Sequence, residues 1–143
     1  MQNKMKLSFL SIPENQAFAR NVIASFALQL NPTLIELNDL KTAVSEAVTN
    51  ATVHGYPDSV GEIVMEATID GNEIHIKISD CGVGIEDLTV ALEPFYSTKG
   101  DSERSGMGFT IMKSFMSNLE VDSSLNVGTV VKMSKIINLK HAE

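Results

Sequence analysis

Polar and apolar residues alternate along three parts of the chain. The stretch KLSFL at residues 6–10 has the period of two that is typical of a strand, and the turn-like SIPEN follows it. EIVMEATI and EIHIKIS alternate in the same way and are joined by DGN, so that Ile74, Ile76 and Ile78 share one face of a strand. We therefore expect a first strand at or near a sheet edge and a hairpin over residues 62–79.

Two segments have the period of a helix instead. From Glu14 to Leu30, apolar residues recur at helical spacing and form one stripe, with Arg20 outside it. The proline in NPT ends this helix because proline cannot continue the hydrogen-bond ladder. A second periodic segment runs from about residue 34 to residue 54, where Gly55 offers a stop.

The rest of the chain predicts a lid, a helix and a second strand pair. A polar segment at 86–105 has no clear period, and GMGFTIMKSFMSN then predicts a helix opened by glycines. LEVDSS and TVVKMSKII, joined by LNVG, read as antiparallel strands. Strands and helices are segregated in this order, which favours an α+β fold. We expect a two-layer α/β sandwich whose mixed, mainly antiparallel sheet is covered on one face by three helices.

Composition narrows the class of protein. With 143 residues and 43% hydrophobic composition, we expect residues 1–143 to form a single domain. The net charge of −7 disfavours direct binding to nucleic acid, because the phosphate backbone would be repelled. Cys81 is the single cysteine, and no apolar run approaches the roughly 18 residues of a membrane span. These features predict a reducing, cytoplasmic location without a disulfide or a membrane anchor.

Two motifs are candidates for chemistry, although each has a simpler explanation. Glu46 and Asn50 share one stripe of the second helix, which by itself is more often a solvated face. Asp80 follows a strand, where its carboxylate can accept a hydrogen bond from an exocyclic amine, while Gly82 and Gly84 let the backbone approach a flat ring. Adenine meets both demands, but aspartate and glycine are also the commonest turn formers.

Two glycine pairs later in the chain complete the pattern. The amides of 106–108, at a helix start, can hold phosphate oxygens, although a hinge has the same sequence. Gly128 and Thr129 add a hydroxyl that can support Asp80 or the base, or else form a tight turn. Coincidence of all four motifs in this order is improbable.

The combined pattern resembles the ATP-binding fold of DNA gyrase, heat-shock chaperone ATPases, histidine kinases and mismatch-repair ATPases, called the GHKL or Bergerat fold. LKTAVSEAVTNATVHGY, YSTKGDSERSGMGFTIMKSFM and ENQAFAR are similar to segments of bacterial anti-sigma factors that are also serine kinases, most closely those of sporulation. The resemblance implies a chain that binds a sigma factor of the sigma F type and keeps it from RNA polymerase. It also implies an ATP-dependent serine kinase that inactivates an anti-anti-sigma protein, and a homodimer.

The resemblance also implies roles for individual residues. Glu46 is similar to the family's catalytic base, and Asn50 to its magnesium ligand. Arg20, on the first helix, matches a family position that contacts the sigma factor and the antagonist. Lys99 and Arg104 lie in the lid, where a cation can offset phosphate charge or meet a partner, and Arg104 is expected to bind a partner. The residues implied to bind ATP or ADP are Asn50, His54, Asp80, Gly82, Gly84, Thr98, Lys99, Ser105, Gly106, Met107, Gly108 and Thr129.

Three positions depart from the family pattern, and other functions stay open. Cys81 stands where an acidic or amide residue is usual, Gly100 replaces a lid proline, and Gln16 stands where an acidic residue is expected. The alternatives are a stress-response anti-sigma kinase, a non-catalytic sigma-binding module whose lid is shaped by nucleotide, and a detached histidine-kinase catalytic domain. His54 is expected to line or cap the pocket and not to carry a phosphate, because no separate helical hairpin is predicted to present it.

Overall fold

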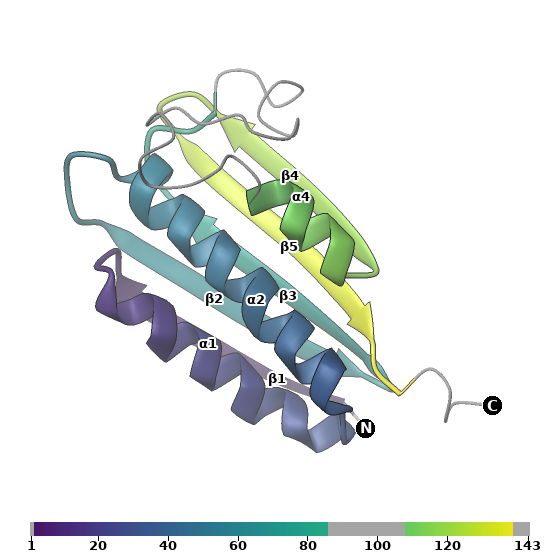
Figure 1. Ribbon diagram of the computed structural model, residues 1–143. Coiled ribbons are helices and arrows are strands. Elements are labelled where there is room, and N and C mark those ends of the chain that lie inside the picture. Colours follow the sequence, from purple (N-terminus) through teal and green to yellow (C-terminus); the bar gives the residue numbers. More distant parts are fainter. Residues whose placement is uncertain (1, 86–107, 139–143) are drawn as a thin grey trace.

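The computed structural model describes residues 2–85 and 108–138, which form one five-stranded sheet with helices on one face (Figure 1). The strands lie in the order β1-β2-β3-β5-β4, and all four pairings are antiparallel. The sequence had predicted a mixed, mainly antiparallel sheet, whereas every pairing in the described residues is antiparallel. The predicted α+β class is confirmed. The strands are β1 (Gln2–Leu10), β2 (Glu62–Asp70), β3 (Glu73–Asp80), β4 (Asn118–Ser124) and β5 (Gly128–Ile136).

Three helices cover one face of the sheet, as expected from the sequence: α1 (Glu14–Ala27), α2 (Leu34–Asn50) and α4 (Gly108–Phe115). α2 packs between the other two, and Figure 1 shows it running across the middle of the sheet. Ile23, Val44 and Val48 from the helices are fully buried against strand residues such as Met65 and Ile76. Burial of such side chains stabilises the fold by about 1.5–3 kcal/mol each.

The strand alternation sorts side chains between the two faces. Ile74, Ile76 and Ile78 are buried under the helices, whereas His75 and Lys77 are exposed on the opposite face. The hairpin between β2 and β3 is confirmed, with Gly71 at a positive φ of 63° in the turn. β1 is at the edge of the sheet, where the sequence placed it.

The ends of the predicted helices are shifted in the structure. α1 ends at Ala27 and continues as a 3₁₀ turn over Leu28–Leu30, before Asn31 adopts a left-handed conformation. The third helix is shorter than predicted, because the Ser117 amide bonds to the Ser134 carbonyl and the chain enters β4 at Asn118. Helix ends depend on such tertiary partners, which residue periodicity does not report.

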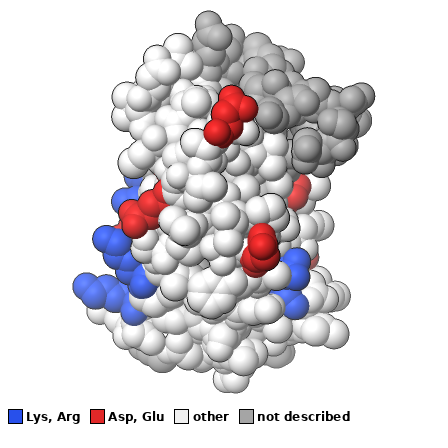
Figure 2. All heavy atoms as spheres, turned by 90° about the vertical axis from the view of Figure 1, so that its left-hand side faces the viewer, with Lys and Arg blue, Asp and Glu red and all other residues white. Residues whose placement is uncertain are grey.

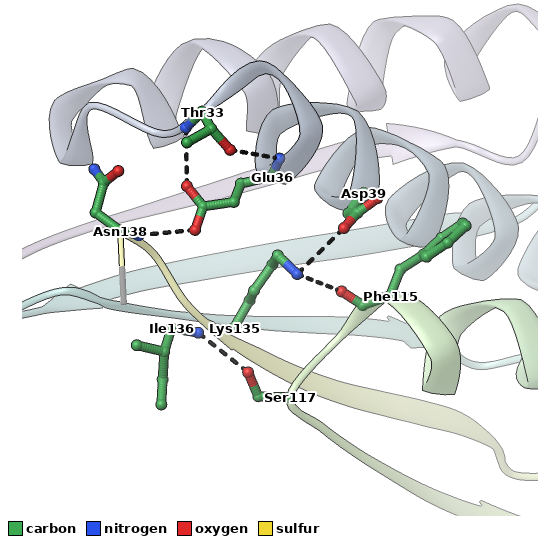
Figure 3. A network of polar contacts seen from close by, with 8 residues as sticks. All are labelled: Thr33, Glu36, Asp39, Phe115, Ser117, Lys135, Ile136 and Asn138. Atoms are coloured by element: carbon green, nitrogen blue, oxygen red, sulfur yellow. Dashed lines mark hydrogen bonds and ion pairs between the residues drawn. The ribbon is translucent and has the colours of Figure 1, made fainter. Parts of the chain in front are cut away.

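A polar network ties the start of α2 to the end of β5 (Figure 3). Thr33 and Glu36 form a capping box, in which each side chain accepts a hydrogen bond from the other's backbone amide. The second oxygen of Glu36 accepts the Asn138 amide at 2.8 Å. Burial alone would raise the pKa of the Glu36 carboxyl, but the hydrogen bonds from Thr33 and Asn138, with nearby Lys135, hold that pKa below its ordinary value.

Lys135 extends this network to α4. Its ammonium donates to the Phe115 carbonyl at the end of α4, at 2.6 Å, and lies 3.5 Å from an Asp39 carboxylate oxygen on α2. Figure 3 shows the side chain reaching from β5 between the two helices. A cation at a helix C-terminus also interacts favourably with the helix dipole. Lys135 therefore links the C-terminus of α4 and the second turn of α2 to the strand that carries Thr129.

The Thr33→Ala variant is expected to lose about 1 kcal/mol of unfolding free energy, because the Glu36 amide at the helix start loses its side-chain acceptor. Urea unfolding followed by circular dichroism measures this loss. Thr33→Ser keeps a hydroxyl at the same place and should stay within a few tenths of a kcal/mol of the wild type. Equal stability of all three proteins would show that the capping box does not stabilise α2.

Candidate functional site

The two residues of the predicted catalytic pair lie one turn apart on α2. Glu46 is in the last two turns of the helix and Asn50 is its final residue. Both side chains are half-buried, so they keep access to the surface, while Val44, Ala47 and Val48 on the same helix face the core. The helix therefore holds an acid and an amide at its C-terminal end and is anchored by its apolar side.

The sequence had predicted a helix as far as residue 54, but the α-helical form ends at Asn50. Residues Ala51–Gly55 form a π-helical turn, in which the Tyr56 amide bonds to the Ala51 carbonyl five residues back, at 3.1 Å. π turns inside helices are rare and are frequent at functional sites. Here the turn delivers Gly55 to the end of β3.

The Asp80 carboxylate is the buried charge of this region. It is the last residue of β3, is 7% exposed, and accepts the Gly82 amide at 2.9 Å. A Cβ atom on Gly55 would lie 2.9 Å from one carboxylate oxygen, so the end of the π turn touches Asp80 directly. Burial raises the pKa of Asp80, and the hydrogen bonds from the Gly82 and Thr129 backbone offset this only in part.

The structure explains two predicted site glycines by contact with the protein's own backbone. A Cβ atom on Gly82 would lie 2.0 Å from the Gly55 carbonyl oxygen, and the Val83 amide donates to that same oxygen at 2.8 Å. Gly84 has a φ of +76° and would meet the Ser124 carbonyl oxygen at 2.2 Å. Larger residues would push these segments apart. Contact of either glycine with a base stays a prediction.

The hairpin turn between β4 and β5 supports the same loop. The Thr129 hydroxyl lies 2.8 Å from the Ser123 hydroxyl, and Thr129 pairs with Asp80 in the sheet register. The Ser123 oxygen accepts the Ile85 amide at 2.8 Å and donates to the Gly128 carbonyl at 3.0 Å. The sequence pointed to Thr129 but gave no signal for Ser123, because a serine in a strand is unremarkable until its partners are known.

Gln16, which departs from the family pattern, joins α1 to the helix of the catalytic pair. Its amide donates to the Thr49 hydroxyl and to the Ser45 carbonyl at 3.3 Å. These two residues flank Glu46 in the sequence, and Arg20 follows one turn later on α1, half-buried. The departure at residue 16 is therefore part of the α1–α2 contact, whereas the Cys81 thiol is exposed beside Asp80.

Several predicted residues fall outside the described part of the chain. Gly108 is the first residue of α4, as expected for a helix opened by glycine. The residues outside the described ranges are Thr98, Lys99, Gly100, Arg104, Ser105, Gly106 and Met107, which include the predicted lid cations and most of the predicted phosphate site.

Beyond the predicted site, the described residues contain a groove, but neither a cluster of candidate metal ligands nor a helix that could span a membrane. A groove of about 480 Å³ opens on the sheet face opposite the helices, lined by residues such as Glu66, His75 and Lys132, and no predicted site residue lines it. Among residues 2–85 and 108–138, no group of three or more His, Cys, Asp or Glu side chains is arranged to hold a metal. No helix in these ranges has the length and apolar character needed to cross a membrane.

The fold is that of a known ATPase class. The family of histidine kinase-like ATPase domains matches residues 9–135. The structure is similar to the RsbU and RsbW domains of a Mycobacterium tuberculosis protein, with a TM-score of 0.69 and 17% identity over 94% of this chain. It is also similar to a blue-light activated histidine kinase of Erythrobacter litoralis, with a TM-score of 0.55 and 20% identity over 75% of this chain. The chain spans about a third of each of those longer structures.

Closer relatives narrow the class. The anti-sigma F factor of a Thermoanaerobacter species is 52% identical over 94% of both chains. The anti-sigma F factor of Clostridium kluyveri is 49% identical over 95% of this chain and 96% of its own, and that of Clostridium perfringens is 52% identical over 96% and 99%. The chain therefore belongs to the histidine kinase-like ATPase family and, within it, to the anti-sigma F factors. It is a kinase-type ATPase domain, and membership of this family implies nucleotide binding.

Proposed function

We propose that this protein binds a sporulation sigma factor of the sigma F type and keeps it from RNA polymerase. In the same proposal, it uses ATP to phosphorylate a serine of an anti-anti-sigma protein and so inactivates that antagonist. The observation that carries the proposal is the contact of Asp80 with Gly55, at the end of the π turn that directly follows Glu46 and Asn50 on α2, in a chain with anti-sigma F relatives of nearly the same length. This contact supports an arrangement in which one nucleotide has its adenine at Asp80 and its γ-phosphate near Glu46 and Asn50.

Asp80 is the group proposed to read adenine. One carboxylate oxygen is held by the Gly82 amide, so the carboxylate has a defined orientation and keeps further acceptor sites for an exocyclic amine. Burial strengthens such a hydrogen bond, because water competes less for the acceptor. The residues at this point therefore fit an adenine base, although glycines 82 and 84 also serve the protein's own packing.

Glu46 and Asn50 are proposed to act at the phosphate end. An Asn amide oxygen is a suitable ligand for magnesium, which usually keeps several waters and takes only one or two protein side chains. The lack of a multi-residue metal cluster in the described ranges is thus compatible with a single ligand at Asn50. When bound, the ion would neutralise phosphate charge. Glu46, one turn earlier and partly exposed, would accept the proton of the attacking serine hydroxyl.

The α1 side of the molecule is the proposed partner surface. Arg20 lies there, and Phe18 is 46% exposed on the same helix. Figure 2 shows the side of the molecule to the left in Figure 1, on which acidic and basic side chains are scattered among uncharged ones. Aromatic side chains and arginines are both enriched at protein interfaces. We propose that Arg20, with Arg104 outside the described residues, contacts the sigma factor and the antagonist, and that the protein works as a homodimer in the cytoplasm.

The test combines partner capture with a phosphate assay. The protein is mixed with a sigma F type factor and with the antagonist, in ATP and in ADP, and captured partners are identified. A phosphate-affinity gel then follows the antagonist after incubation with Mg-ATP. Sigma capture and phosphoserine on the antagonist are expected. Sigma capture without phosphoserine would identify a non-catalytic binding module, and acid-labile phosphate on a histidine would overturn the serine-kinase assignment.

A further inference from the structure

The pairing of β2 with β3 ends in an unusual way beside Asp80. The last pair in the register is Ile63 with Asp80, so the next pair would be Glu62 with Cys81. In a continued antiparallel ladder, the Cys81 amide and the Glu62 carbonyl would face one another. In the structure neither bonds to the other, and Cys81 lies just beyond the end of β3.

The hydroxyl of Tyr56 lies between these two groups. It accepts the Cys81 amide at 2.7 Å and donates to the Glu62 carbonyl at 2.8 Å. The Tyr56 hydroxyl oxygen thus replaces a direct hydrogen bond between the two backbones. Because this oxygen lies between them, the strands are farther apart here than in a regular ladder. This insertion is where the chain of Asp80-Cys81-Gly82 leaves the sheet.

The tyrosine ring is held firmly at this position. A Cβ atom on Gly61 would lie 2.3 Å from the Tyr56 ring, so the ring packs directly on the Gly61 backbone. Gly61 in turn exchanges hydrogen bonds with Ser11, at 2.8 and 2.9 Å. Burial raises the pKa of Tyr56 further above neutral pH, so the hydroxyl is protonated and can donate there.

Tyr56 also fixes the π turn that packs against Asp80. It directly follows Gly55, whose backbone touches the Asp80 carboxylate and whose carbonyl accepts the Val83 amide. The Tyr56 amide closes the π turn on Ala51, only one residue after Asn50. The same residue therefore fixes the loop that follows Asp80 and the turn that packs against it.

We propose that Tyr56 is a positioning residue for the recognition of adenine. Its hydroxyl, inserted between β2 and β3, sets the place and orientation of the Asp80 carboxylate. This role rests on the proposed reading of adenine by Asp80. In this proposal Tyr56 acts through Asp80 and not by contact with the nucleotide. In Tyr56→Phe the Cys81 amide loses its acceptor, and the ladder can close by one direct bond to Glu62, which would draw the loop and Asp80 out of place.

The experiment compares ATP with inosine triphosphate, which lacks the exocyclic amine of adenine. Dissociation constants for both are measured by calorimetry on the full chain with magnesium, for the wild type and for Tyr56→Phe. We expect the variant to bind ATP about tenfold more weakly, as for the loss of one well-placed hydrogen bond, and inosine triphosphate less than about twofold more weakly. The turnover number at saturating ATP should stay within about threefold of the wild type.

Thr33→Ala is the matched control, because it destabilises the fold far from this loop and should leave the ratio of the two dissociation constants unchanged. If Tyr56→Phe lowers the melting temperature but keeps the wild-type ratio, Tyr56 is only structural and the inference is overturned. If the wild type itself does not prefer ATP over inosine triphosphate, the adenine-reading role of Asp80 fails, and the role of Tyr56 fails with it. A changed ratio in the variant alone supports the inference.

Discussion

Glu46→Gln should bind Mg-ATP about as well as the wild type and transfer the phosphoryl group to the antagonist serine about 10²–10⁴-fold more slowly. The amide keeps the size of the side chain, but it cannot accept the proton of the attacking hydroxyl. Single-turnover phosphorylation at saturating ATP measures the chemical step, and fluorescence or calorimetry measures binding. Binding and transfer then report separately on the pocket and on the base.

Glu36→Gln is a close control for this variant, because it makes the same chemical change on the same helix. Glutamine also completes a capping box, so the start of α2 should be retained. Phosphoryl transfer by Glu36→Gln is expected to match the wild type within about twofold. Wild-type transfer by Glu46→Gln would remove Glu46 from the role of base and leave binding as the established part of the site.

Asp80→Asn is expected to separate nucleotide binding from stability. The loss of a charged acceptor for the adenine amine should weaken ATP binding by about 10–100-fold, the range expected for a hydrogen bond to a charged group. The melting temperature should stay the same or rise near neutral pH, because the wild type holds a buried carboxylate there. Calorimetric titration and thermal unfolding at the same pH measure the two effects. Asp122→Asn, an exposed change on β4, should alter neither.

The pH dependence of this stability difference has a defined sign. Burial raises the pKa of Asp80 in the folded protein above its ordinary value of 3.8, so the folded state binds a proton more readily than the unfolded state. The stabilisation from this proton is complete below pH 3.8 and is lost as pH rises through the raised pKa. The advantage of Asp80→Asn over the wild type should therefore grow across that interval. If the unfolding free energies of the wild type and Asp80→Asn stay parallel from about pH 3.5 to 7, the raised pKa of the buried Asp80 carboxyl is contradicted.

Much of the fold could be predicted because its determinants are local. The alternation of Ile74, Ile76 and Ile78 with exposed residues predicts a strand with one buried face, and the sheet has this arrangement. The glycine turn at residue 71 and the proline after α1 also act within a few residues. Helix ends were less accurate, because Ala51–Gly55 widens into a π turn through contacts with Asp80 and Val83 that lie far along the chain.

The candidate site was predicted only in part for the same reason. The order of all four motifs and the family resemblance pointed to Glu46, Asn50 and Asp80, because each of these residues taken alone has a simpler explanation. Tyr56 and Ser123 were missed, because a tyrosine after a helix and a serine in a strand carry no local signal. Their hydroxyls matter only through partners that other strands supply, such as Cys81 and Ile85.

By itself, the sequence determined the strands, the helices, the sheet's buried face and the order of the site motifs, because periodicity and turn chemistry act over a few residues. Only the tertiary structure decided how the ends of α2 and β3 meet. There the Gly82 position has no room for a side chain against Gly55, and one tyrosine hydroxyl separates two strands. The contacts of Gly55 with Gly82 and of Tyr56 with Cys81 join residues about 25 positions apart, and their energy depends on distances that exist only once the chain has folded.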